Sequence, residues 1–465
     1  MNAVGHAVPH AVLHAYRYAH ASTAQAGPAG ARLSLATSSP LAEGGAAHPH
    51  FFEGTLLQPR LCAELLAAVH LVVGSRFFTP ANSVARAIAL ADPVVTAGGE
   101  LLRFEGFSAC CSCYVRVDLL PASYDGQVVG KGTTNVDFNA PMRAALARVR
   151  DADGLALSVG RDALTLRSGG GEVVERKVAL PLRWLRGMVE VQSYLAGMRP
   201  RFELKGLEAL RFFRTLPKAS TSRTPLWVVP SPTGPFTTTR AHPQGVRVTD
   251  TSRLRVLEPL LPRARSLAVH ADAAQQASAW VLDLPGARLT LALSAEPWRG
   301  FSGEGQALRA LMRMDDERAV AQVRAQLNWQ PLIDTAALAH TLSVAPASVE
   351  DSLRILGASG LVGFDVAEGR YFHRVLPFDL SSVEDMHPRL AGARELLARG
   401  AVRIDSASPV AAQVTSGGTV HSVREIDGEL RCTCPWYARH QGERGPCKHV
   451  LAVEASASAA AKGDQ

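Results

Sequence analysis

The spacing of apolar residues along the chain predicts helices and strands that alternate over most of its length. Apolar positions at helical spacing predict helices over 56–73, 81–90, 141–149, 182–198, 207–216, 253–262 and 302–314. Alternating apolar positions rich in β-branched and aromatic residues predict strands over 31–36, 101–120, 266–269, 279–284 and 287–293. Strand pairs are also expected to turn near 153–154 and 168–171, and a loop is expected over 130–139. This pattern is typical of an α+β protein.

The chain is long enough for several domains, because 465 residues exceed one ordinary hydrophobic core. We expect an Ala/His-rich segment 1–50, an α+β domain 51–217, a second α+β unit 243–317, a winged-helix-like segment 318–378, a small C-terminal unit 400–456 and a flexible tail 457–465. The Ser/Thr/Pro-rich stretch 218–242 separates the two α+β units as a border or exposed loop. The predicted fold class is therefore multidomain α+β.

The segment 318–378 has the element order of a winged helix-turn-helix. Helices are predicted over 318–327, 335–342 after a cap at Asp334, and 349–358 after a cap at Ser348. Two strands within 361–373 then form the predicted wing. In such a fold the third helix enters the major groove of DNA.

The charges of this segment leave two roles open. Arg370, His373 and Arg374 on the predicted wing could contact phosphates. However, Glu350 and Asp351 lie near the end of the third helix that would approach DNA, and these acids would repel phosphate. The charge pattern favours a structural or protein-docking role slightly over direct DNA reading.

Composition and charge exclude several classes of protein. With 47% hydrophobic and 20% charged residues the chain has the composition of a folded protein, and its net charge of +7 favours polyanionic partners only slightly. The longest nearly apolar stretch, 61–73, is too short to span a membrane. The N-terminus lacks the features of a secretory signal, and the seven cysteines are clustered rather than spread as in a disulfide scaffold. We therefore expect a cytoplasmic protein with reduced thiols and no membrane partner.

The strongest chemical signal lies near the C-terminus. Cys432 and Cys434 form a Cys-x-Cys pair, and after twelve residues Cys447 and His449 form a Cys-x-His pair. Zinc prefers a tetrahedral shell of thiolates and imidazole, and four protein ligands leave no open position for a substrate. Strands are predicted before this constellation, over 401–404, 411–416, 418–426 and 429–432, and a helix over 450–455 follows it. The spacing predicts a structural zinc ion. His421 and His440 lie nearby as alternative ligands, which we interpret as bystanders.

Residues 400–456 resemble the SWIM zinc-finger family, whose pattern is Cys-x-Cys, a variable spacer and Cys-x-His after two or more strands. The flanking sequences Cys-Thr-Cys-Pro-Trp and Gly-Pro-Cys-Lys-His-Val-Leu-Ala add to the resemblance. The longer N-terminal part looks similar to that of bacterial SWIM-finger proteins. The resemblance implies zinc binding, with DNA binding or protein interaction as the role.

Basic and aromatic residues cluster around the predicted zinc ligands. The candidates for contact with nucleic acid or a protein partner are Arg431, Trp436, Tyr437, Arg439, Arg444 and Lys448. Cations would neutralise phosphates and the aromatic rings would stack on bases. The alternative is that Trp436 fills a small core and the cations form a solvated rim, and the sequence does not choose between the two.

The remaining motifs carry weaker signals. Cys110, Cys111 and Cys113 lie in a strand-like run and are expected to be buried small residues rather than a metal site. Neither a phosphate-binding loop nor a hydrolase or kinase signature is present.

We therefore expect a non-catalytic zinc-binding protein that contacts DNA or another protein through its C-terminal modules, with the N-terminal part as scaffold. The alternative is a pure protein adaptor without nucleic-acid contact. A less favoured class is an enzyme with an unrecognised site in 50–315, for which a cleft holding Asp118, Asn135 and Asp137 would be the first sign. No small-molecule substrate is indicated.

Overall fold

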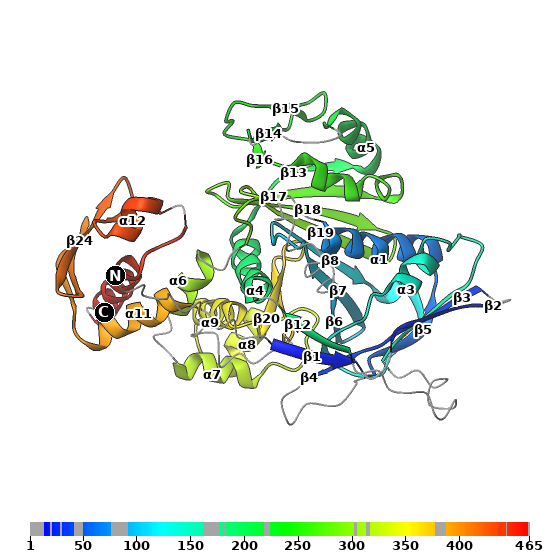
Figure 1. Ribbon diagram of the computed structural model, residues 1–465, viewed down its shortest axis with the longest axis horizontal. Helices are drawn as coiled ribbons and strands as arrows, with labels where there is room; N and C mark the ends of the chain where they lie inside the picture. The colour runs from blue at the N-terminus through cyan, green and yellow to red at the C-terminus, as the bar shows by residue number, and fades with distance from the viewer. Residues whose placement is uncertain are drawn as a thin grey trace, which may run out of the picture.

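Six β-sheets and the helices packed on them make up the part of the chain that the computed structural model describes (Figure 1). The structure describes residues 14–18, 21–27, 30–40, 50–75, 92–160, 176–180, 182–217, 224–301, 305–312, 317–376, 387–442 and 444–463. The predicted fold class is confirmed, because helices and strands are mixed throughout and several separate sheets are present. None of the helices among these residues is both long and apolar enough to cross a membrane.

An eight-stranded antiparallel sheet forms the centre of the molecule, in the order β10-β6-β7-β8-β19-β18-β17-β13. Its strands are β6 (Val94–Gly98), β7 (Leu101–Phe107), β8 (Cys113–Leu119), β10 (Gly132–Asn135), β13 (Arg199–Lys205), β17 (Ser266–Ala271), β18 (Ala277–Leu284) and β19 (Ala287–Ser294). Because β8 pairs with β19, this sheet crosses the predicted border between 51–217 and 243–317. The two segments that we separated therefore share one sheet.

The two faces of this sheet carry separate cores. Helix α1 (Pro59–Gly74) covers one face, where Val115 and Val117 of β8 join its apolar side chains. Helix α4 (Leu182–Gly197) lies on the other face, and Tyr114 points into the core there. Successive side chains of a strand point to opposite faces, so Arg116 and Asp118 also lie on the α4 side. All seven residues of β8 are buried.

Smaller sheets flank the central one. Their strands are β1 (His14–Tyr18), β2 (Thr23–Gly27), β3 (Gly30–Leu35), β4 (Ser38–Pro40), β5 (Phe52–Leu56), β9 (Tyr124–Val128), β11 (Leu155–Val159), β12 (Arg176–Leu180), β14 (Leu226–Val229), β15 (Phe236–Thr238) and β16 (Val246–Val248). They form a five-stranded sheet in the order β2-β3-β11-β5-β9 and two three-stranded sheets, β12-β1-β4 and β15-β14-β16. Helices α3 (Ala140–Leu146) and α5 (Gly206–Thr215) complete this part.

Several local predictions need correction. The expected loop 130–139 contains the edge strand β10, and the expected loop 218–242 contains β14 and β15. The expected helix 253–262 consists of two short 3₁₀ helices. Strand β11 follows the turn near 153–154, but it pairs with β3 and β5 and does not form the expected hairpin. The predicted helix 81–90 and the turn near 168–171 lie outside the described residues.

The segment 318–378 has the predicted order of elements. It contains α7 (Glu317–Ala325), α8 (Thr335–Leu342), α9 (Pro346–Ala358), β20 (Val362–Asp365) and β21 (Arg370–His373). Asp334 caps α8 by accepting a 2.9 Å hydrogen bond from the Ala337 N–H. Ser348 is not the cap of α9, because this helix begins earlier at Pro346, whose ring favours the first helical position. Helix α9 packs against α4, α7, α8 and α6 (Gln306–Met312).

Buried charges fasten the β20–β21 hairpin to the central sheet. Asp365 of the hairpin lies 2.9 Å from Arg116 Nη2 and 3.5 Å from Arg103 Nη2. The same two arginines bind Asp118 of β8 at 3.0 and 2.9 Å. Phe372 of β21 lies under both guanidinium groups, with its ring centre 3.9 Å from Arg103 Cζ and 5.3 Å from Arg116 Cζ. The predicted wing is therefore part of the body of the protein.

Two of the three expected phosphate contacts on this hairpin are wrong. Arg374 is fully buried and forms an ion pair with Glu105 of β7. His373 is buried, its Nδ1 accepts a 2.7 Å hydrogen bond from the Trp329 N–H, and its ring stacks on Trp329. Only Arg370 is exposed. The sequence alone does not show whether a basic residue on a strand faces solvent or a buried carboxylate.

The C-terminal module forms one end of the molecule (Figure 1). Its elements are α11 (Pro388–Ala398), β22 (Val402–Ala407), β23 (Val410–Ser416), β24 (Thr419–Ile426), β25 (Glu429–Cys432), α12 (Pro435–His440) and α13 (Lys448–Gly463). The four strands form an antiparallel sheet in sequence order, and α13 packs against all of them. Asp427 and Gly428, at φ values of 55° and 76°, make the two-residue turn that joins β24 to β25. The four predicted strands of this module are confirmed.

Candidate metal centre

The four predicted ligand residues come together in the C-terminal module. Cys432 ends β25, Cys434 immediately precedes α12, Cys447 immediately precedes α13, and His449 lies in the first turn of α13. Their ligand atoms all lie within 4.8 Å of one another, and all four residues are buried. The fold of the module thus brings the two ligand pairs together in a single cluster.

Backbone N–H groups surround the sulfur atoms. Cys434 Sγ accepts a hydrogen bond from the Tyr437 N–H at 3.3 Å, and Cys447 Sγ accepts one from the Val450 N–H at 3.4 Å. Both cysteines sit at the start of a helix, where the N–H groups and the helix dipole stabilise negative charge on sulfur. Cys432 Sγ accepts a third such bond from the Cys434 N–H at 3.4 Å. These N–H groups would therefore stabilise the thiolates that a bound cation would hold at these positions.

The spacing of the donor atoms fits a tetrahedral zinc ion. His449 Nδ1 lies 3.7 Å from Cys432 Sγ and 4.0 Å from Cys447 Sγ. Zinc bonds of about 2.3 Å to sulfur and about 2.0 Å to nitrogen place tetrahedral donors roughly 3.5–3.8 Å apart. Three soft thiolates with one imidazole are a donor set that selects zinc over hard cations such as Mg²⁺. The residues present therefore fit a closed structural zinc site.

The three thiols of this cluster differ in pKa. A hydrogen bond from Cys432, outweighing the opposing effect of burial, lowers the pKa of Cys447 to about 4, and the same hydrogen bond raises the pKa of Cys432. Burial raises the pKa of Cys434. Cys447 is therefore a thiolate beside the protonated Cys432 and Cys434. A bound cation would displace the two remaining protons and hold three thiolates.

The two other histidines of the module remain outside the cluster. The His421 ring on β24 lies against the ring of His449, with centroids 4.4 Å apart. The His440 ring packs against Trp436 at a centroid distance of 4.9 Å. Neither residue belongs to the four-residue group.

The two predicted aromatic contacts take part in packing. Trp436 and Tyr437 are half-buried and pack against the core of the module. Arg389 of α11 covers the Trp436 ring, with its Cζ 4.7 Å from the ring centre. This favours the small-core interpretation for Trp436. Nothing in the sequence singles out Arg389, because it lies far from the ligand pattern and a single arginine near the start of a helix carries no signal.

The predicted basic contacts are mostly accessible. Arg431, Arg439 and Arg444 are exposed, and Lys448 is half-buried. Arg431 forms an ion pair with Asp427 at 3.3 Å, which neutralises part of its charge. Arg439 and Arg444 are therefore the strongest candidates for an external anionic partner.

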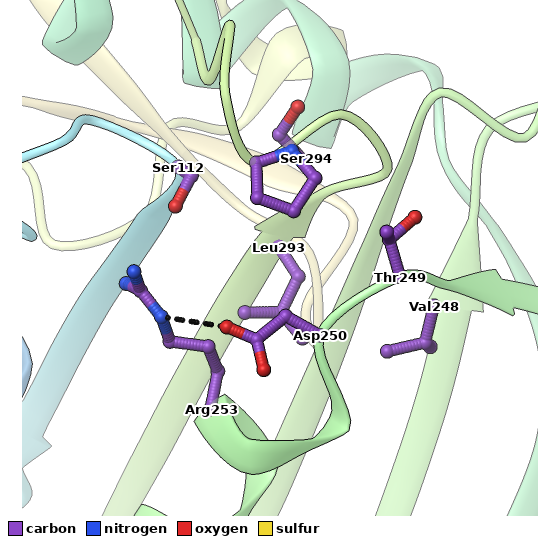
Figure 2. Close-up of a pocket in the computed structure, with 8 residues that line it drawn as sticks. Ser112, Val248, Thr249, Asp250, Arg253, Leu293 and Ser294 are labelled. Carbon is purple, nitrogen blue, oxygen red and sulfur yellow. Dashed lines mark hydrogen bonds and ion pairs between the residues drawn. The ribbon is translucent and has the colours of Figure 1, made fainter. Parts of the chain in front are cut away.

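The cysteine group at the turn between β7 and β8 lies beside a small hollow and is not a metal cluster among the described residues. Cys110 Sγ lies 3.1 Å from Arg253 Nη2 and 3.1 Å from Ser112 Oγ. Arg253 also pairs with Asp250 at 3.2 Å (Figure 2). The hollow beside them is lined by Ser112, Val248, Thr249, Asp250, Arg253, Leu293, Ser294 and Pro297. Burial raises the pKa of Cys113 to about 12, so that residue is an unreactive thiol. All three cysteines are buried, as expected.

Two of the three polar residues named for a catalytic cleft have partners elsewhere. Asp118 is part of the buried ion network. Asp137 accepts hydrogen bonds from the Ser22 N–H and from Asn139 Nδ2, both at 2.9 Å. Neither Asp118, Asp137 nor Asn135 lines either of the two best-formed hollows in the described part of the chain.

Comparisons with known proteins match part of this module to one family and, among solved structures, find similarity over about half of the chain. A search of curated proteins found no match. Among solved structures, similarity extends to Proliferating Cellular Nuclear Antigen from Entamoeba histolytica, with 9% identity, 52% of this chain, 98% of that chain and a TM-score of 0.33. It also extends to a DnaN sliding clamp (DNA polymerase III subunit beta) from Bartonella birtlesii bound to griselimycin, with 12% identity, 52% of this chain, 65% of that chain and a TM-score of 0.31. Residues 423–457 match the family model described as SWIM zinc finger. Together with the four clustered residues, this match identifies the C-terminal segment as a SWIM zinc finger, as the resemblance predicted.

Proposed function

We propose that this chain is a non-catalytic zinc-binding protein whose SWIM finger contacts nucleic acid, with DNA as the first candidate. The observation that carries the proposal is the closed, buried cluster of three cysteines and one histidine. Four protein ligands leave no position for a substrate or an activated water, so the ion would hold the finger together. A module this small depends on such an ion for much of its folding free energy, about 10 kcal/mol or more for comparable zinc peptides.

The charges of the described surface favour the finger over the winged-helix-like segment as the contact element. On α9, Arg354 forms ion pairs with both Glu350 and Asp351, which leaves an acidic excess there. Exposed Arg439 and Arg444 lie close to the ligands in the finger. Since phosphates attract cations and repel carboxylates, the finger is the better match for a nucleic-acid backbone.

Two further parts of the proposal rest on side chains outside the contact surface. The absence of catalysis is supported by Asp118 and Asp137, which already have internal partners. A cytoplasmic location is supported by the seven cysteines, all of which are free of disulfides.

The second candidate function is a protein adaptor that does not touch nucleic acid. Val420 and Ile426, near the two ends of β24, are 56% and 43% exposed, and exposed apolar side chains of this size suit a protein partner. The engagement of Trp436 in internal packing also removes one ring that would stack on bases.

The test measures zinc and duplex binding in the same full-length samples. Elemental mass spectrometry on wild type should give about one zinc per chain, and Cys447→Ser should lose it while Cys62→Ala, a cysteine outside the finger, keeps it. Fluorescence anisotropy with a random DNA duplex should show binding that weakens as salt rises, because phosphate contacts release counterions. A wild type without zinc would refute the zinc function. A zinc-loaded protein that does not bind the duplex would support the protein-adaptor function.

Two substitutions test the predicted contacts. Arg439→Ala and Arg444→Ala should each reduce the slope of log affinity against log salt by roughly 0.9 if each neutralises one phosphate. Arg150→Ala, at an 81% exposed side chain on the central domain, is the matched control and should leave the slope unchanged.

A further inference from the structure

The strongest unassigned feature around the metal centre is Arg389, which touches both ligand-bearing segments. It lies in the first turn of α11, outside residues 423–457 that match the finger family. Its Nη1 donates hydrogen bonds to the carbonyl oxygens of Arg444 and Pro446, each at 2.8 Å. Pro446 immediately precedes the ligand Cys447, so this contact fixes the backbone that presents the second ligand pair.

The same guanidinium also contacts the segment that follows the first ligand pair. Its Cζ lies 4.7 Å from the centre of the Trp436 ring, two residues after the ligand Cys434. A cation over the face of a tryptophan ring is attracted by the electrons of the ring. Arg389 thus joins the segment that follows Cys434 to the segment that precedes Cys447, and the two segments come from opposite ends of the spacer.

Helix α11 provides a fixed base for this contact. It packs against α13, which carries His449, and against α6 of the body. At Gly392 a Cβ atom would come 3.1 Å from Lys448 Cδ, so the two helices approach closely between the ligands Cys447 and His449. Farther along α11, Arg394 Nη2 donates a 3.3 Å hydrogen bond to the Leu311 carbonyl of α6. The arginine therefore extends from an anchored helix to the metal loop.

We propose that Arg389 is a positioning residue for the metal centre, holding the two ligand pairs at the separation that zinc requires. This inference rests on the proposed zinc function. Groups that orient metal ligands typically change metal affinity by about 10–100-fold when removed. A planar guanidinium can donate along its edge and stack through its face at once, which an ammonium group cannot do. The role therefore needs arginine rather than any cation.

The experiment compares Arg389→Met, Arg389→Lys and Arg399→Met in the full-length protein. Met keeps length and apolar packing but donates no hydrogen bond, and Lys keeps charge and donors but loses the stacked plane. Arg399 is the C-cap residue of the same helix and its side chain is 73% exposed, so its substitution is the matched control. The readouts are zinc affinity by chelator competition and the visible spectrum of the Co²⁺-loaded protein, which reports the ligand field directly.

Arg389→Met should weaken zinc binding by roughly 10–100-fold and change the Co²⁺ spectrum, with Arg389→Lys between it and wild type. Arg399→Met should match wild type in both. If wild type binds zinc and Arg389→Met binds it equally well with an unchanged spectrum, the positioning role is refuted while the proposed function stands. If wild type binds no zinc, the proposed function itself fails. Hydrogen exchange in the central sheet, unchanged in all variants, shows that a loss is local to the finger.

Discussion

Replacing Asp365 by asparagine should loosen the hairpin β20–β21 from the central sheet. Asp365 is 1% exposed and faces Arg116, Arg103 and Arg288 at 2.9, 3.5 and 3.4 Å. Asparagine keeps the shape and some hydrogen bonds but removes the charge, so Arg103 and Arg116 would share Asp118 alone. Breaking a buried ion pair on one side costs about 3–5 kcal/mol, because the remaining charges stay out of water.

Hydrogen exchange followed by mass spectrometry at neutral pH measures this effect where it occurs. A loss of about 3–5 kcal/mol in opening free energy corresponds to exchange that is roughly a hundredfold to several thousandfold faster in peptides covering the hairpin. Asp351→Asn is the control, since that side chain is 69% exposed and its ion pair with Arg354 lies at the surface. It should change exchange little, because surface substitutions usually stay within about 0.5 kcal/mol. Hairpin exchange in Asp365→Asn equal to that of the control would refute the assigned role of the buried network.

The same carboxylate predicts a pH dependence. Burial alone would raise the pKa of Asp365, but the charges of Arg116, Arg103 and Arg288 outweigh burial and lower it to about 2. The unfolded value is about 3.9, so the folded state binds its proton less readily. The stabilisation is therefore complete above about pH 4 and is lost as the pH falls towards 2. Urea midpoints of wild type should fall more steeply across this window than those of Asp365→Asn, and parallel profiles would contradict the assignment.

Four other perturbations test the packing of the hairpin and the finger. Chelation of the metal should abolish exchange protection in the four-stranded sheet of the finger and spare the central sheet; simultaneous loss in both would show that the two unfold together. Gly363→Ala should destabilise the hairpin by about 1–3 kcal/mol in urea unfolding, because its Cβ would lie 2.2 Å from Phe372 Cζ. Gly428→Ala, at φ 76° in an open turn, should cost about 1 kcal/mol through backbone strain alone, and a larger loss than for Gly363→Ala would reverse this ranking. Arg389→Ala should increase the solvent exposure of Trp436, seen as a red shift of its fluorescence in a variant whose other tryptophans are phenylalanine.

Features that depend on neighbouring residues were predictable from the sequence. The Asp427–Gly428 turn, the cap of α8 at Asp334 and the Asn139 cap of α3 follow from local backbone chemistry. The metal ligands belong to the same class, because zinc chemistry restricts both the residue types and the spacing within each pair. Cys432 and Cys434 are only two residues apart, and their partners Cys447 and His449 repeat this spacing.

Features that join distant segments were decided only by the tertiary structure. The pairing of β8 with β19 unites in one sheet two segments that we predicted as separate units. No local sequence pattern indicates which strands will be neighbours. Arg116 and Arg374 have the sequence signature of surface cations, yet their carboxylate partners Asp365 and Glu105 lie hundreds of residues away along the chain. Arg389 likewise acquires its contacts with the metal loop only when α11 docks on α13. The sequence specifies the charge of a side chain, but its burial and its partner depend on which surfaces the folded chain brings together.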